Sequence, residues 1–203
     1  MSPLEIAAVV ASVAGVWLTV RRHPLCWPVS LLSVILYARV FFEAKLYSDM
    51  LLQGVFGAFA LYGWWQWRRG LGDDGRVRVL RLSRFGLVAG LAAGAAGSAA
   101  LGLVMATRTD AAVPWLDASL TCFSLVAQYW AARKYIESWW MWIAVDIVYT
   151  GLFLSRDLTL TAILYAAFIG LAVQGLRDWR TVGRRQDQSG ETPDGPLHSD
   201  ARR

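Results

Sequence analysis

Long apolar runs alternate with short polar stretches along most of this chain. Seven apolar segments can be read, covering residues 4–20, 27–42, 46–67, 85–105, 115–132, 139–154 and 158–176. About 20 mainly apolar residues span a bilayer as a helix, and several of these runs are shorter, so we expect their ends to extend into the loops. The pattern predicts an all-α membrane protein of seven transmembrane helices in a lipid bilayer.

The composition excludes a soluble globular domain. Of the 203 residues, 56% are hydrophobic and 17% are charged, and the mean hydropathy is +0.40. A soluble domain carries about 25% charged residues. The net charge of +5 comes from basic residues beside the apolar runs. Because no basic recognition motif accompanies it, we expect no nucleic-acid partner.

The basic residues predict the orientation of the chain. One side of the membrane would collect sixteen of them, namely Arg21, Arg22, Arg68, Arg69, Arg76, Arg78, Arg81, Arg84, Arg133, Lys134, Arg177, Arg180, Arg184, Arg185, Arg202 and Arg203. The other side would hold three, Lys45, Arg108 and Arg156. Because cytoplasmic loops are enriched in lysine and arginine, we expect the N-terminus outside and the C-terminus in the cytoplasm.

The sequence also repeats itself at an offset of 112 residues. Eleven identities fall in positions 27–68 without a gap, and they include Trp27 with Trp139, Gly63 with Gly175, and Trp67 with Trp179. Three helices reverse the direction of the chain, so a fourth is needed before the second copy can run parallel to the first. Parallel repeats are a transporter architecture in which the substrate site lies between the copies.

The repeat divides the chain into four parts. Residues 1–68 form the first three-helix repeat, and residues 69–113 form a basic cytoplasmic loop and a connector helix rich in alanine and glycine. Residues 114–180 form the second three-helix repeat, and residues 181–203 have the composition of a disordered cytoplasmic tail. Small residues in the connector favour close helix packing.

Two segments resemble the repeats of the PnuC-type vitamin transporters. They are residues 27–67, which begin WPVSLLSVILYARVFFE, and residues 115–180, which contain SWWMWIAVDIVYTGLF. The resemblance implies a 3+1+3 helix fold similar to that of SWEET sugar transporters, in the bacterial inner membrane and as a homo-oligomer. It further implies uptake of nicotinamide riboside by facilitated diffusion, with a cytoplasmic kinase trapping the product. Members that carry thiamine or riboflavin leave the identity of the vitamin open.

Asp146 is the strongest candidate for a substrate-binding residue. About nine residues at ~1.5 Å each separate it from the expected start of its helix, which places it near the middle of the bilayer. A carboxylate at that depth is expensive unless it faces a cavity or a partner. Trp142, Asp146 and Tyr149 share one helix face, and an aromatic ring beside a carboxylate suits a cationic ring that bears a ribose. A structural hydrogen bond to Tyr37 or Tyr149 is the alternative.

The other candidates are amides and tryptophans. Gln53, Gln128 and Gln174 are uncharged amides inside spans, which either bind a carboxamide or bridge helices. Most of the 11 tryptophans fall toward the expected cytoplasmic ends, and we interpret them as an aromatic belt at the headgroups. Trp64 and Trp142 are the exceptions that we assign to the site.

Other classes of membrane protein fit less well. A retinal protein needs a lysine in its last helix, and Lys45 and Lys134 lie at the ends of other spans. A membrane enzyme is not expected, because no hydrolase, nucleotide-binding or metal motif occurs, and neither a cofactor nor a metal is predicted. A ligand receptor without transport remains a remote alternative.

Overall fold

The structure, a computed structural model, describes residues 3–43, 47–70, 77–109 and 113–188. These contain seven helices: α1 (Pro3–Val20), α2 (Cys26–Glu43), α3 (Tyr47–Arg68), α4 (Arg84–Arg108), α5 (Pro114–Ala132), α6 (Ser138–Ser155) and α7 (Thr159–Gln188). Each expected span matches one helix. The boundaries agree within about three residues, except that α7 continues well past residue 176.

The extension of α7 revises the expected tail. Residues 181–188 are helical, so the disordered tail predicted from residue 181 does not begin there. Residues 189–203, the rest of that tail, lie outside the described residues, as do the loop residues 71–76 and 110–112.

Length and apolar composition alone allow α1, α2, α4 and α7 to cross a membrane. The other three helices are 22, 19 and 18 residues long and together carry eight of the 11 tryptophans. They contribute Gln53, Gln128 and Asp146 to the interior of the bundle, where polar groups do not face lipid.

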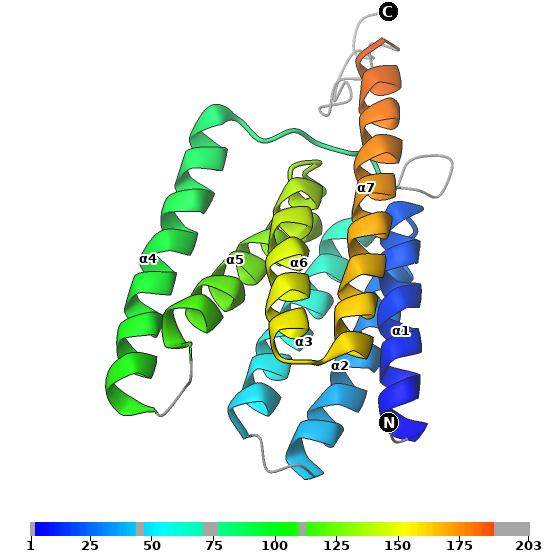
Figure 1. Cartoon of the computed structure of the whole chain (residues 1–203). Coiled ribbons are helices and arrows are strands. Elements are labelled where there is room, and N and C mark those ends of the chain that lie inside the picture. The colour runs from blue at the N-terminus through cyan, green and yellow to red at the C-terminus, as the bar shows by residue number, and fades with distance from the viewer. Residues whose placement is uncertain (1–2, 44–46, 71–76, 110–112, 189–203) are drawn as a thin grey trace, which may run out of the picture.

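Six helices form a closed ring in the order α1, α2, α3, α5, α6, α7, in which each helix packs against the next and α7 returns to α1. Among the described residues, α4 packs against α5 alone and stands outside the ring (Figure 1). Its glycines make this contact close. A Cβ at Gly94 would lie 2.6 Å from the ring of Phe123, and one at Gly102 would lie 2.5 Å from the ring of Trp115. Larger residues at these positions would force α4 away from α5.

The core contains tryptophans that we expected at the headgroups. Five of them expose less than a tenth of their surface: Trp27, Trp67, Trp130, Trp139 and Trp179. The belt interpretation is wrong for these five, because their side chains pack against other helices in the protein interior. Trp27 packs edge-to-face on Trp67 with ring centroids 5.5 Å apart, and Trp139 packs in the same way on Trp179 at 5.4 Å. Four others, Trp17, Trp65, Trp115 and Trp140, are about half exposed and fit the belt.

Glycine makes room for two of the buried rings. Gly63 on α3 faces the ring of Trp27, and a Cβ there would overlap it. Gly175 on α7 faces the ring of Trp139, where a Cβ would lie 2.6 Å away. Each indole ring therefore lies directly on a helix backbone.

Candidate functional site

The six-helix ring encloses a cavity of about 380 Å³. Every helix of the ring contributes to its wall, and none of the lining residues belongs to α4. The volume lies at the lower end of the ~300–1,000 Å³ of typical small-molecule sites. The cavity can therefore hold a molecule the size of a vitamin.

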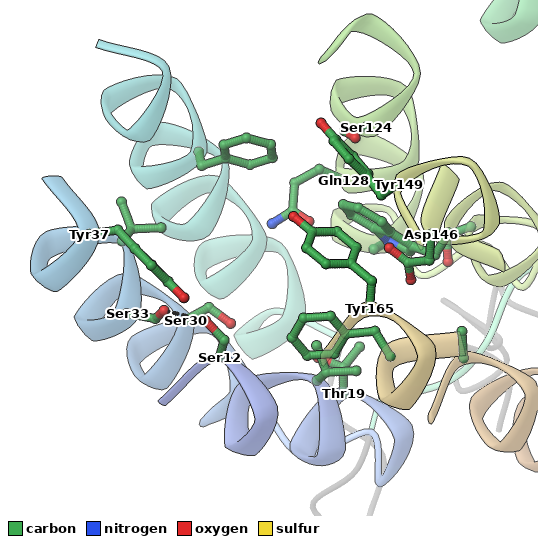
Figure 2. A pocket seen from close by; sticks show the side chains of 18 of the residues that line it. Ser12, Thr19, Ser30, Ser33, Tyr37, Ser124, Gln128, Asp146, Tyr149 and Tyr165 are labelled. Atoms are coloured by element: carbon green, nitrogen blue, oxygen red, sulfur yellow. Dashed lines mark hydrogen bonds between the residues drawn. The ribbon is translucent and has the colours of Figure 1, made fainter. Parts of the chain in front are cut away.

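Asp146 lies on the α6 wall of this cavity (Figure 2). The residue is only 5% exposed, because the ring of helices surrounds it. Among the described residues, its carboxylate has no hydrogen-bond or ion-pair partner, whereas its backbone carbonyl accepts a hydrogen bond from the Thr150 hydroxyl at 2.7 Å. Nothing in the described part of the chain supports the alternative, a structural hydrogen bond to Tyr37 or Tyr149. A buried carboxylate without a protein partner is expensive, and a bound ligand can supply the missing partner.

Aromatic side chains surround this carboxylate. Trp142 and Tyr149, which precede and follow Asp146 by one turn of α6, also line the cavity. The ring of Tyr149 lies 4.9 Å from that of Tyr165 on α7. In Figure 2, Tyr165 lies between the Asp146 side of the cavity and the side on which Tyr37 lies. The wall combines the π-faces and the single negative charge that a flat, electron-poor or cationic ring requires.

Six of the eight predicted site residues lie together on the cavity wall: Asp146, Trp142, Tyr149, Tyr37, Gln53 and Gln128. The structure does not bring Gln174 and Trp64 to it. Gln174 points outward on α7 and is exposed. Trp64 is partly buried and packs against the hydrophobic core cluster, and the guanidinium of Arg68 lies 5.8 Å from its ring.

Apart from Tyr37 and Tyr149, sequence reasoning missed the hydroxyl-bearing side chains of the cavity. They come from Ser12, Thr19, Ser30, Ser33, Ser124, Ser138 and Tyr165. Several are engaged with the protein itself. The hydroxyls of Ser12 and Ser33 lie 2.6 Å apart, and each is 3.0 Å from the carbonyl of Ala8. A signal was available, since Ser12 and Ser124 coincide at the predicted offset of 112 residues.

Comparisons with known proteins agree with this arrangement. Residues 2–181 match the family described as nicotinamide mononucleotide transporter. The chain belongs to this family. It is therefore a multi-pass membrane protein among transporters of small vitamin-related molecules, and its relatives are not enzymes.

Two curated relatives differ in what they carry. The chain is 33% identical to the riboflavin/roseoflavin transporter RibM of Streptomyces davaonensis, over 83% of this chain and 80% of RibM. It is 24% identical to the nicotinamide riboside transporter PnuC of Escherichia coli, over 77% of this chain and 76% of PnuC.

A solved structure supports the fold. The crystal structure of the vitamin B3 transporter PnuC superposes with a TM-score of 0.75 at 24% identity, over 90% of this chain and 82% of that one. The helical arrangement is therefore that of the family.

Proposed function

We propose that this chain carries nicotinamide riboside across the bacterial inner membrane. The observation behind the proposal is the unpartnered carboxylate of Asp146, which lies in the cavity one helical turn from the indole of Trp142. Nicotinamide riboside has a cationic pyridinium ring and a hydroxylated ribose. The ring can stack on an aromatic face, and the carboxylate can offset the charge or accept hydrogen bonds from ribose hydroxyls.

We propose further that transport is facilitated diffusion and that phosphorylation in the cytoplasm traps the product. Coupled carriers often place paired acids or a cation site within the membrane. Among the residues described as lining the cavity, Asp146 is the one acidic side chain. A lone carboxylate paired with a cationic substrate leaves no second site for a coupling ion.

The architecture that we propose is a pair of parallel repeats, with the N-terminus outside and the C-terminus in the cytoplasm. Contacts recur at the offset of 112 residues. The indole N–H of Trp67 donates to the carbonyl of Ala131 at 3.1 Å, and that of Trp179 donates to the carbonyl of Thr19 at 3.2 Å. Each donor and each acceptor is 112 positions from its counterpart. Such reciprocal contacts are typical of a two-fold axis.

Riboflavin is the second candidate substrate, and the 33% identity to RibM favours it. Its isoalloxazine ring is large and neutral, so it would stack on the same aromatic wall. It would leave the charge of Asp146 without a counter-ion, although the carboxylate could still accept a hydrogen bond from a ring N–H. Thiamine, a third vitamin, also carries a positive ring.

Titration of the purified protein with nicotinamide riboside, riboflavin and thiamine separates these candidates. We expect the tightest binding for nicotinamide riboside, and uptake into proteoliposomes without an imposed ion gradient. Tight riboflavin binding with no response to nicotinamide riboside would overturn the substrate assignment. Binding without uptake would favour the receptor alternative.

We also expect a homo-oligomer in the membrane. Because α4 contacts only α5 among the described residues, the rest of its apolar surface is free to face lipid or a second copy. The mass of the protein in detergent or lipid nanodiscs tests this expectation.

A further inference from the structure

A short extended segment closes the arginine-rich end of the bundle. Residues 77–82, which we call the strap, run between the start of α4 and the turns that join α1 to α2 and α5 to α6 (Figure 1). The N–H of Val77 donates to the carbonyl of Arg22 at 3.4 Å, and the Arg22 guanidinium donates back to the Val77 carbonyl at 3.0 Å. The N–H of Leu80 donates to the carbonyl of Lys134 at 2.9 Å. The strap is therefore bonded to both halves of the ring.

The two acceptor carbonyls are equivalent. Arg22 and Lys134 are 112 positions apart, and both have left-handed backbone conformations, with φ of 57° and 68°. Non-glycine residues adopt this conformation infrequently, and here it turns the carbonyl toward the strap in both halves. Burial and the charge of Arg133 lower the pKa of the Lys134 side chain.

The strap makes further hydrogen bonds to the turn between α5 and α6. The carbonyl of Leu80 accepts a hydrogen bond from the N–H of Ile136 at 3.0 Å, which completes a bridge of parallel β type with Tyr135. The N–H of Leu82 donates to the carboxylate of Glu137 at 3.0 Å. Hydrogen bonds to charged groups are stronger than neutral ones, so Glu137 fixes the end of the strap.

A layer of tryptophans separates the strap from the cavity. Trp27 and Trp139 belong to the cavity wall, whereas Trp67 and Trp179 lie behind them and are fully buried. The rings of Trp67 and Trp179 have centroids 5.9 Å apart. Val77 of the strap belongs to the same buried cluster. Among the described residues, this layer and the strap therefore lie between the cavity and the arginine-rich end.

We propose that the strap is a latch that holds the two halves of the ring together and must release one turn before the cavity opens at the arginine-rich end. The proposal rests on the proposed function, because a carrier has to open the cavity at both ends. Rocking one half against the other separates the two turns. Since the strap is bonded to both, that motion breaks the bonds on one side.

Cys26 provides a native reporter of latch release. It is 1% exposed and packs in the same buried cluster as Val77. The chain has two cysteines, so a Cys122→Ala background leaves Cys26 as the sole thiol. The rate at which a small maleimide labels Cys26 in proteoliposomes then measures how often this end opens, without any vitamin present.

Two variants weaken the latch from opposite sides. Arg22→Gly removes the guanidinium and keeps a residue that tolerates a positive φ, and Glu137→Ala removes the acceptor of the Leu82 N–H. We expect each to speed labelling of Cys26 about tenfold, which corresponds to 1.4 kcal/mol. Arg21→Ala is the matched control. It removes the same charge from an exposed neighbour that packs on Trp17, and it should leave the rate unchanged.

The second cysteine distinguishes release from unfolding. In a Cys26→Ala background, Cys122 on α5 reports global loosening. Faster labelling of Cys26 alone supports the latch, whereas equal rates in all variants, or faster labelling of both cysteines, overturn it. Because labelling needs no substrate, a wild-type protein that transports none of the three vitamins would sink the proposed function and leave the labelling result intact.

Discussion

Replacing Asp146 with asparagine removes the negative charge of this residue and keeps its size. The carboxylate lies in the cavity, is 5% exposed, and has no hydrogen-bond or ion-pair partner among the described residues. Within the described part of the chain, the substitution therefore breaks no hydrogen bond or ion pair of the side chain. Its effect on ligand binding should come from the lost charge alone.

The magnitude follows from the type of bond that is lost. A hydrogen bond to a charged group contributes about 1.5–3 kcal/mol, which is roughly a 10- to 150-fold change in affinity. Stability should change in the other direction. A buried charge without a partner destabilises the fold, so Asp146→Asn should leave the melting temperature unchanged or raise it. If the carboxylate instead held the fold together, its replacement would lower the melting temperature.

Calorimetric titration with nicotinamide riboside and a thermal melt of the same sample measure both effects. Asp178→Asn is the control, because Asp178 is exposed and lies outside the cavity. The reasoning is refuted if Asp146→Asn binds like the wild type and melts earlier. A loss of affinity for riboflavin as large as that for nicotinamide riboside would show that the carboxylate acts as a hydrogen-bond acceptor rather than as a counter-charge.

Three further predictions concern other parts of the molecule. Gly63→Ala and Gly175→Ala should each lower the free energy of unfolding by about 1–3 kcal/mol, because the added Cβ overpacks an indole ring. Gly54→Ala is the control, since a Cβ there meets nothing within 4 Å, and unequal losses at Gly63 and Gly175 would count against the repeat. Trp142→Ala should weaken vitamin binding severalfold or more in a titration, and Trp64→Ala, off the cavity wall, should leave the affinity unchanged. A reporter fused to the C-terminus should be cytoplasmic and one in the loop between α4 and α5 external, and finding both on one side would exclude the proposed topology.

The sequence alone predicted the helices and where they begin and end. Span boundaries depend on local composition, because a run of apolar residues partitions into a bilayer whatever its neighbours do. This is why the expected segment 27–42 became Cys26–Glu43. The exception was α7, whose last three turns are polar and lie beyond any apolar run. Hydropathy carries no signal for a helix that leaves the membrane and continues.

Only the tertiary structure decided which side chains meet. Gln128 faces the cavity and Gln174 does not, although both are amides inside apolar helices. Trp179 is fully buried although its position in the sequence resembles that of a headgroup tryptophan. In a soluble helix the polar face marks the outside, but lipid is as apolar as the protein core, so the pattern along a span does not reveal how the helix is rotated. That rotation, and with it the cavity and the strap, is set by the packing of the neighbouring helices.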